Sequence, residues 1–403
     1  MEGWKDINLG DIIHIKHGYG FKGKYFVEEP NHNLLLTPGN FAIGGGFKSD
    51  KMKYYDGLIN DEFVLSSGDV IVTMTDLSMK ADTLGYSAKI PNNPENTYLH
   101  NQRLGLVSLK TNEFDLDYIY WLLRTYNYQK YIAGSSSGAT VKHTSPKKIY
   151  SAKLLVPESK VTQKRIADIL SSYDDLIENN LKRIKLLEQA AQNIYKEWFV
   201  NLRFPGYENT PVNEETGLPE GWEEKMLKDL CHLTMGQSPK SEYYNLENEG
   251  LPFHQGVTGY GNRFVTHSTY CKKITRIAEE GDILCSVRAP VGRLNISPSK
   301  LIIGRGLSAI RNKNGFQSFQ FCQLKNHFYQ EDMIGGGAIF NSVTKKVLEE
   351  QKLLSPDIKT QEGFEKIVIP IDNQIVNLDA QNQKLKVARD ILLPRLMNRT
   401  IEV

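Results

Sequence analysis

Gly221–Leu230 reads GWEEKMLKDL, just past the middle of a chain of 403 residues, yet it has the form of a beginning. The true beginning, Gly3–Ile12, reads GWKDINLGDI. Both stretches open with Gly-Trp and a charged pair, place a leucine at the same position, and end with Asp and an aliphatic residue. An internal repeat decides a fold before any single motif does, so a second copy of the whole first half has to be sought.

Four further pairs of segments agree in the same order along the two halves. They are HGYGFKGKYF (17–26) with MGQSPKSEYY (235–244), SSGDVIVTMT (66–75) with EEGDILCSVR (279–288), AGSSSGATVKHT (133–144) with IGGGAIFNSVT (334–344), and KLLVP (153–157) with KLLSP (352–356). Five matches in one order are hard to explain except by duplication. Short apolar runs such as 69–73 and 283–287 are typical of strands, whereas 115–132 and 316–333 have helical spacing, so each copy is expected to be mixed α/β.

Each half ends in an apolar pattern long enough for one helix of about 40 residues. Apolar residues recur at spacings of three and four over 166–198 and again over 364–396, which is the stripe of an amphipathic helix. Pro370 and Pro394 are expected to bend or interrupt the second helix. Asn382 falls on the apolar stripe, where a polar residue often fixes the register of paired helices.

Two packing arrangements are open for these helices. Each could pack on its own globular domain, or the two could pack against each other. A helix of about 40 residues is about 60 Å long and extends beyond a domain of about 150 residues, which favours helix against helix. The stretch between the first helix and the second copy is rich in Pro, Gly, Asn and Glu, which is typical of a linker.

The expected layout therefore has five parts. They are a first globular domain at 1–160, a long helix at 161–203, a linker at 204–220, a second globular domain at 221–359, and a second long helix at 360–403.

Composition excludes several classes of protein. With 40% hydrophobic and 24% charged residues the chain has the balance of a soluble globular protein. No apolar run approaches the roughly 20 residues of a membrane span, and the N-terminus lacks the pattern of a signal peptide. The four cysteines form no Cys-x-x-Cys pair, which suits a reducing cytosol and predicts a cytoplasmic location. A net charge of +2 does not by itself call for nucleic acid.

Catalytic motifs are not convincing anywhere in the sequence. GYGFKG (18–23) fits a dinucleotide-binding glycine pattern, but no helix is expected after it, and Tyr25 stands where a P-loop needs Ser or Thr. His14 and His17 are the closest histidine pair and lack further metal ligands nearby. There is no G-x-S-x-G, no H-E-x-x-H and no Asn- or Asp-Pro-Pro-aromatic motif of an amino-group methyltransferase. The chain is not expected to be an enzyme, nor to bind a metal or cofactor itself.

Polar and basic residues on the matched loops form a candidate DNA-reading surface. Arg and Lys contact guanine edges and phosphates, and Asn and Gln contact adenine. Each such residue alone is more often an ordinary solvated side chain, but their placement on equivalent loops of two copies favours recognition. The predicted contacts are Tyr19, Lys22, Lys24, Thr75, Ser136, Thr140, Lys142 and His143 in the first copy, and Gln237, Ser238, Lys240, Tyr243, Arg288, Arg293, Asn341 and Ser342 in the second, with Arg305 also basic and on a loop.

The order of these parts resembles the specificity subunit of type I restriction–modification systems. The stretches that carry the resemblance are GDILCSVRAPVGRLNI (281–296), GRGLSAIR (304–311), the Gly/Ser loops leading to KLLVP and KLLSP, and EWFVNLRFPGYEN (197–209) followed by LPEGWEEK (218–225). The resemblance implies an α+β chain with two target recognition domains related by a pseudo-twofold axis. Two long antiparallel helices would form a coiled-coil rod that separates them, and each domain would read one half of a split, asymmetric DNA site.

The resemblance also implies partners and a division of labour. The specificity subunit of this family is non-catalytic. Two methyltransferase subunits dock on it and bring S-adenosylmethionine, and restriction (translocase) subunits can join them. Tyr195, Trp198 and Phe199 are expected to form an exposed, partner-binding group, because they exceed what a two-helix seam hides. The first copy departs from the VRAPVG pattern, with Thr75-Asp76 where the second has Arg288 and Ala289.

Two other classes of function stay open at this point. A self-contained DNA methyltransferase with duplicated recognition domains would bind S-adenosylmethionine alone, and the missing motif counts against it. A repeat scaffold with no role on DNA would give no footprint on any DNA, with or without partners.

Overall fold

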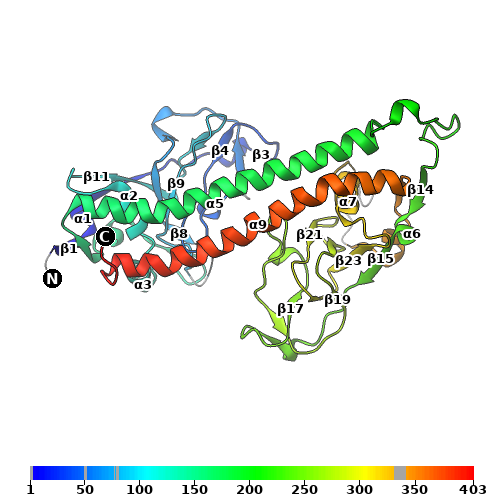
Figure 1. Ribbon diagram of the computed structural model, residues 1–403. Coiled ribbons are helices and arrows are strands. Elements are labelled where there is room, and N and C mark those ends of the chain that lie inside the picture. Colours follow the sequence, from blue (N-terminus) through cyan, green and yellow to red (C-terminus); the bar gives the residue numbers. More distant parts are fainter. Residues whose placement is uncertain (1–2, 50–51, 77, 79–80, 331–341) are drawn as a thin grey trace. The chain divides into compact units, whose positions relative to one another are not determined.

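The computed structural model describes residues 3–49, 52–76, 78, 81–330 and 342–403, and the chain forms two compact units. Unit 1 consists of Met1–Asn179 and Gln381–Val403, and unit 2 of Asn180–Ala380. Two long helices contribute to both units (Figure 1): α5 (Lys160–Tyr195), which continues as a π-helix over Lys196–Val200, and α9 (Ile358–Met397). Each unit therefore contains one globular copy and a part of each long helix. The five domain boundaries predicted from the sequence stay predictions.

Unit 1 is built on two sheets. One has the strand order β2-β11-β7-β9, and the other β3-β5-β4-β10-β6, in which β4 and β10 are parallel. Two strand pairs, β1-β13 and β12-β8, complete it. The strands are β1 (Trp4–Asn8), β2 (Ile13–His17), β3 (Phe26–Val27), β4 (Asn33–Leu35), β5 (Lys53–Tyr55), β6 (Val64–Leu65), β7 (Val70–Thr73), β8 (Thr75–Asp76), β9 (Ser87–Lys89), β10 (Thr97–Leu99), β11 (Leu104–Leu109), β12 (Lys142–His143) and β13 (Lys153–Pro157).

Unit 2 repeats both sheets and the pairing of the first strand with the last, and it has an isolated Arg288–Ser342 bridge where unit 1 has the pair β12-β8. Its sheets have the orders β15-β23-β20-β21 and β16-β18-β17-β22-β19, with β17 and β22 parallel, beside the pair β14-β24. The strands are β14 (Glu223–Met226), β15 (Cys231–Met235), β16 (Tyr244–Asn245), β17 (Leu251–His254), β18 (Tyr270–Cys271), β19 (Ile277–Ala278), β20 (Ile283–Ser286), β21 (Leu294–Ile296), β22 (Leu301–Ile303), β23 (Leu307–Asn312) and β24 (Lys352–Ser355). The predicted duplication of a mixed α/β domain is thereby confirmed.

The paired beginnings in the sequence have a common structural role. Each forms one strand followed by one helical turn, β1 with α1 (Leu9–Ile12) and β14 with α6 (Leu227–Leu230). Each opening strand pairs antiparallel with the last strand of its own copy, so KLLVP returns to β1 and KLLSP to β14. The start and end of each copy are thus joined directly before the chain enters a long helix.

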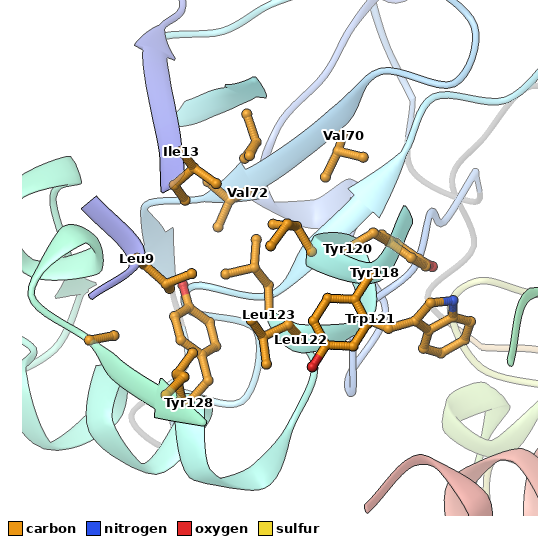
Figure 2. Close-up of a cluster of buried hydrophobic side chains, with 14 of the residues drawn as sticks. Leu9, Ile13, Val70, Val72, Tyr118, Tyr120, Trp121, Leu122, Leu123 and Tyr128 are labelled. Atoms are coloured by element: carbon orange, nitrogen blue, oxygen red, sulfur yellow. The ribbon is translucent and has the colours of Figure 1, made fainter. Parts of the chain in front are cut away.

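The core of unit 1 lies between the sheet strand β7 and the helices α2 (Leu116–Leu122) and α3 (Tyr126–Ser135). Figure 2 shows Tyr118, Trp121 and Tyr128 with Val70 and Val72 of β7, Leu9 of α1 and Ile13 of β2. Burial of one such large side chain stabilises the fold by about 2–3 kcal/mol. The indole Nε1 of Trp121 donates a hydrogen bond to Ser171 Oγ of α5 at 2.9 Å, which ties the globular copy to the long helix.

The remaining helices follow the same duplication. They are α4 (Pro146–Tyr150) in unit 1 and α7 (Gln317–Gln330) and α8 (Lys345–Glu349) in unit 2. Both α4 and α8 stand just before the closing strand of their copy and begin at a hydroxyl residue, Ser145 or Thr344, whose side chain accepts a hydrogen bond from a backbone N–H of the first turn.

The two long helices run antiparallel inside each unit, as the resemblance implied. In unit 2, Ile184 of α5 packs against Ile375 and Leu378. Trp198, in the π-helix that follows α5, packs against Phe364, which comes earlier in α9. In unit 1, Asp174 forms an ion pair with Arg389. Asp174 comes earlier in α5 than Ile184, and Arg389 comes later in α9 than Leu378, as antiparallel helices require. Asn382 is buried on this face of α9 at 2% exposure, as its place on the stripe predicted.

The expectation that Pro370 and Pro394 could interrupt α9 is wrong, because the helix runs through both residues. Both prolines lie on exposed parts of the helix, where water can satisfy the carbonyl that loses its N–H partner. Ile367 has the three-residue spacing from Phe364 expected of the apolar stripe, but it is 42% exposed and Val368 is buried in its place.

Candidate nucleic-acid interface

Four loops of unit 2 converge where the strands of its two sheets end. Gln237 N–H, just after β15, donates to Ile303 O of β22 at 2.9 Å. Gly306 N–H donates to Gln255 O at 3.0 Å, and Val287 N–H to Gly306 O at 2.9 Å. Arg288 then pairs with Ser342 in an isolated antiparallel bridge. These backbone bonds hold the tips after β15, β17, β20 and β22 together as one surface, which we call the strand-end surface.

Unit 1 makes two of these three backbone bonds at matching positions and has a strand-end surface of its own. Tyr19 N–H donates to His100 O at 2.8 Å, and Met74 N–H donates to Arg103 O at 2.9 Å. Thr75 pairs with His143 through β8 and β12, as Arg288 pairs with Ser342. Matching these bonds, with the parallel pairs β4–β10 and β17–β22, fixes the correspondence of the two copies. Tyr19 corresponds to Gln237, Thr37 to Gln255, Thr75 to Arg288, Gln102 to Arg305, and His143 to Ser342.

A glycine is required at the same point in both copies. Gly18 N–H donates to Leu104 O, and Gly236 N–H to Leu307 O. A Cβ on Gly18 would overlap the carbonyl oxygen of Asn101, and a Cβ on Gly236 would overlap that of Gly304. The glycine shared by the two loops is therefore a packing requirement of the strand-end surface.

Several predicted contacts lie on this surface and are exposed. In unit 2 they are Gln237, Arg288 and Ser342, with Ser238 half-buried beside them. Ser238 Oγ accepts a hydrogen bond from Arg305 N–H at 3.2 Å, which places Arg305 next to it. Arg288 lines a small hollow of about 90 Å³ together with Gln255, Ala289 and Gly306. Arg288, in the loop after β20, and Gln255, in the loop after β17, thus line one hollow. A guanidinium and a side-chain amide side by side are suited to contacting a base edge.

The first copy presents a different set of side chains. Tyr19 is 44% exposed, and its ring contacts Phe21 and Phe63. Thr75 is buried at 6% exposure, and its Oγ1 lies 3.3 Å from His143 Nδ1. Thr75 therefore supports the exposed His143 and does not itself reach the solvent, in contrast to Arg288 at the matching position.

The Gly/Ser loop of unit 1 folds back on itself beside His143. Ser137 and His143 exchange two backbone hydrogen bonds, of 3.0 and 2.8 Å. Thr140 is exposed, Lys142 is half-buried in β12, and Ser136 Oγ donates to Ala133 O at 2.7 Å. These residues are brought to the edge of the strand-end surface. The matching loop of unit 2 includes Asn341, which lies outside the described residues.

The predicted lysines occupy equivalent turns next to the second sheet of each unit. Lys22 precedes the 3-10 turn η1 (Gly23–Tyr25), and Lys240 precedes η6 (Ser241–Tyr243). Lys24 Nζ lies 4.7 Å from the ring centre of Tyr25, and Lys273 Nζ lies 5.1 Å from that of Tyr243. Arg293 is exposed and follows the turn after β20. These residues flank the strand-end surface and are suited to phosphate contact.

Gln102 and Gln255 were missed from the sequence. Both reach the strand-end surface through the strands β10 and β17, whose pairing joins distant segments. A signal for Gln102 exists in the repeat itself, because NQRLGL (101–106) aligns with GRGLSA (304–309) once Leu104 is matched to Leu307.

The expectation that Tyr195, Trp198 and Phe199 form an exposed group is wrong for two of the three. Tyr195 and Phe199 are each 4% exposed, and Trp198 is half-buried. The cause is an aromatic cluster of unit 2 that covers the end of α5. Its other members are Phe204 and Trp222 from the linker side, Phe319 of α7 and Phe364 of α9.

Several buried titratable groups of the two units have displaced pKa values. Burial lowers the pKa of His100 to about 4, although its Nε2 lies 3.0 Å from Leu104 O. Burial and the neighbouring His267 likewise lower the pKa of His254 to about 4. Burial raises the pKa of the Cys231, Cys285 and Cys322 thiols to about 12, so none of the three supplies a thiolate nucleophile at neutral pH.

Within the described residues, no group of three or more His, Cys, Asp or Glu side chains could hold a metal ion. The search for a helix that could cross a membrane, over the same part of the chain, also finds none.

Comparison with known proteins gives one consistent family. The family model described as "Type I restriction modification DNA specificity domain" matches residues 1–189 and 219–387. A relative from Methanocaldococcus jannaschii, named as the MjaX specificity subunit of a type I restriction enzyme, is 34% identical over 313 residues, which are 76% of this chain and 72% of the relative. The HindI specificity subunit of Haemophilus influenzae is 22% identical over an alignment that covers both chains completely.

A solved structure shares the fold. The S subunit of a type I restriction–modification system from M. genitalium superposes with a TM-score of 0.54 at 17% identity, covering 98% of this chain and 96% of that one.

Proposed function

Because this chain belongs to the type I restriction–modification DNA specificity family and is a subunit for DNA recognition, we propose that each of its two copies reads one half of a split DNA site. The two half-sites differ, because the two strand-end surfaces differ in the side chains they present. The first copy offers Tyr19, Gln102 and His143, and the second offers Gln237, Arg305 and Ser342 at the corresponding positions. Arg288 is a further reading position of the second copy, and the exposed Lys22, Lys24, Lys240 and Arg293 act as phosphate contacts around these positions.

The observation that carries this proposal is that the two copies share the backbone frame of the strand-end surface but present different side chains on it. Backbone hydrogen bonds place the tips in the same geometry in both units. Base edges are distinguished by hydrogen-bonding side chains, among which Arg and Gln prefer guanine and adenine respectively. A shared frame with different side chains is the arrangement expected for two readers of two sequences.

The paired long helices would set the distance between the half-sites. Helices α5 and α9 each pass from one unit to the other without a break. A continuous helix transmits a fixed rise of about 1.5 Å per residue. The spacer between half-sites would therefore be constant, and its own sequence would not be read.

The chain would supply recognition and leave chemistry to partners. In this proposal two methyltransferase subunits dock on it and carry S-adenosylmethionine, and restriction (translocase) subunits join them. A second apolar stripe on α9 supports docking. Ile369, Val376, Val387 and Ile391 are between 46% and 59% exposed and recur at helical spacing along α9. The face of α5 that carries Asp175 and Asn193 has fewer exposed apolar residues, with Leu186 at 65% exposure among them.

A double variant tests the docking surface. Val376→Asp with Val387→Asp places two charges on the stripe, and association with the methyltransferase subunit is expected to weaken by about tenfold or more. Asn193→Asp on α5 is the matched control and should leave association unchanged. Titration of the purified subunits gives both affinities, and equal affinities for the wild type and the double variant would rule out this surface.

The test of the main proposal is the methylation pattern of the assembled complex. DNA of random sequence is methylated by the chain with its methyltransferase subunits, and the modified positions are sequenced. The proposal predicts a motif in two unlike parts with an unread spacer of fixed length. A single contiguous motif would defeat it, as would a palindrome, because two copies with different side chains cannot read identical halves.

A further inference from the structure

Unit 2 contains a buried arginine that joins its globular part to both long helices. Arg263 is 6% exposed. Its guanidinium lies 4.0 Å from the ring centre of Phe321 in α7. The same group pairs with Asp372 of α9 at 2.6 Å and with Glu188 of α5 at 3.7 Å. The next residue, Phe264, packs on the seam between the two helices.

Unit 1 contains a buried arginine that likewise contacts an aromatic ring and an aspartate of a long helix. Arg124, also 6% exposed, has its guanidinium 4.2 Å from the ring centre of Trp121. It pairs with Asp174 of α5 at 3.1 Å, and Arg389 of α9 pairs with the same carboxylate. Each unit therefore has a guanidinium that lies on an aromatic ring and faces an aspartate of a long helix.

The two aspartates occupy one position of the repeat. Asp174 lies 11 residues after Gln163, and Asp372 lies 11 residues after Gln361. The two glutamines mark the same point, because each donates from its side-chain amide to the proline that ends its copy, at 2.9 Å to Pro157 O and 2.6 Å to Pro356 O.

The two arginines, in contrast, come from different elements. Arg263 belongs to the loop closed by the Tyr260–Val265 bridge, and the Phe41–Phe47 bridge closes a glycine-rich loop in unit 1. Arg124 comes instead from the end of α2, and its Nε donates to Gly44 O of that loop at 2.9 Å. A Cβ on Gly45 would lie 2.8 Å from Arg124, so the glycine makes room for it. Both guanidinium groups therefore face the equivalent aspartate, although the two arginines come from non-equivalent segments of the two copies.

A buried ion pair of this kind fixes geometry more than it adds stability. Desolvation offsets much of the attraction between the charges, whereas the planar guanidinium accepts only a narrow range of orientations toward a ring and a carboxylate. We infer that Arg263 and Arg124 are positioning residues that hold each recognition domain at one fixed angle on the helices of its own unit. The inference rests on the proposed function, since a fixed angle matters when two domains must meet two half-sites at one spacing.

The test measures spacer tolerance and half-site sequence separately. Complexes with the methyltransferase subunits carry Arg263→Met, Arg263→Lys or Asp372→Asn, with Arg276→Met, an exposed arginine of the same unit, as matched control. Each methylates a library in which the spacer grows one base pair at a time and the half-sites are randomised. The wild-type complex and the Arg276→Met control should methylate targets of one spacer length in preference to all others. Arg263→Met and Asp372→Asn should reduce that preference by roughly tenfold with both half-sites unchanged, and Arg263→Lys should lie between, because it keeps the charge but not the planar contact.

Hydrogen exchange gives a second, independent measurement. The amides of Gly261 and Val265 are bonded to Phe264 O and Ile296 O, and they should exchange faster in Arg263→Met than in the control. The inference is overturned if Arg263→Met and Asp372→Asn keep the spacer profile of wild type, or if they change the second half-site, which would make Arg263 part of the reading surface. A wild-type complex without a two-part motif would instead refute the proposed function and leave the exchange experiment to decide the role of Arg263.

Discussion

The two copies share a backbone frame and differ in what they place on it. Tyr19 and Gln237 follow equivalent glycines, and Gln102 and Arg305 occupy equivalent tips. Where the first copy buries Thr75 beneath His143, the second exposes Arg288. The difference teaches that the frame depends on main-chain bonds and glycines, so side chains at the tips can change without cost to the fold. The second copy, with two arginines, is suited to guanine, and the first is suited to other bases.

The largest expected effect comes from disturbing the shared frame. Gly18→Ala forces a Cβ onto the Asn101 carbonyl, and the backbone shift should cost on the order of 3 kcal/mol in unit 1. Recognition of the first half-site should be lost while that of the second is retained. Gly23→Ala is the matched control, because a Cβ there meets no atom within 4 Å. Urea unfolding and half-site methylation check both effects, and equal stability of the two variants would contradict the requirement for a glycine at position 18.

A smaller effect is expected from side chains on the frame. Arg288→Ala or Arg305→Ala should each relax one base of the second half-site, at about 1–3 kcal/mol, with the first half-site unchanged. Gln102→Ala should do the same in the first half-site only. Methylation of a randomised target library measures these preferences. Uniform weakening without loss of base preference would show that the side chain in question contacts phosphate, and a change in both half-sites would break the comparison between the copies.

The smallest expected effect is an acid sensitivity that differs between the units. The pKa of His100 in unit 1 and of His254 in unit 2 is about 4, below the ordinary value of about 6.5. The unfolded chain therefore binds protons more readily, and the stability from each neutral histidine is complete above about pH 6.5 and is lost as the pH falls toward 4. At pH 5.5 each histidine should already lower the free energy of unfolding by roughly 1 kcal/mol. Unit 2 should lose more, because burial also lowers the pKa of His267, which contacts His254.

Hydrogen exchange at pH 7.5 and 5.5 resolves the two units in this experiment. His254→Phe should reduce the loss of stability at pH 5.5 in unit 2 and leave that of unit 1 unchanged. The control His232→Gln, at an exposed site, should leave the loss of stability unchanged in both units. An equal response of both units to His254→Phe would show that the units do not unfold separately.

The features that could be predicted from the sequence are those that depend on local patterns of residues. Five matched segments predicted the duplication, and apolar spacing predicted both long helices and the buried Asn382. The failures have a common cause, since they depend on segments that meet only in the folded chain. Tyr195 and Phe199 are covered by Phe319 and Trp222, which lie far away in sequence. Gln102 and Gln255 reach the strand-end surface through parallel strands, and no spacing pattern links Arg263 to Asp372.

The central claim is that two equivalent readers are held apart by a pair of helices of fixed length. The most direct measurement inserts four residues into each helix, after Lys182 in α5 and after Ala380 in α9, which adds about one turn, or roughly 6 Å, while both seams stay nearly in phase. The assembled complex then methylates targets whose spacer grows one base pair at a time. Because base pairs are about 3.4 Å apart, the preferred spacer should lengthen by one or two base pairs with both half-sites unchanged. An active complex that keeps the original spacer would contradict the account.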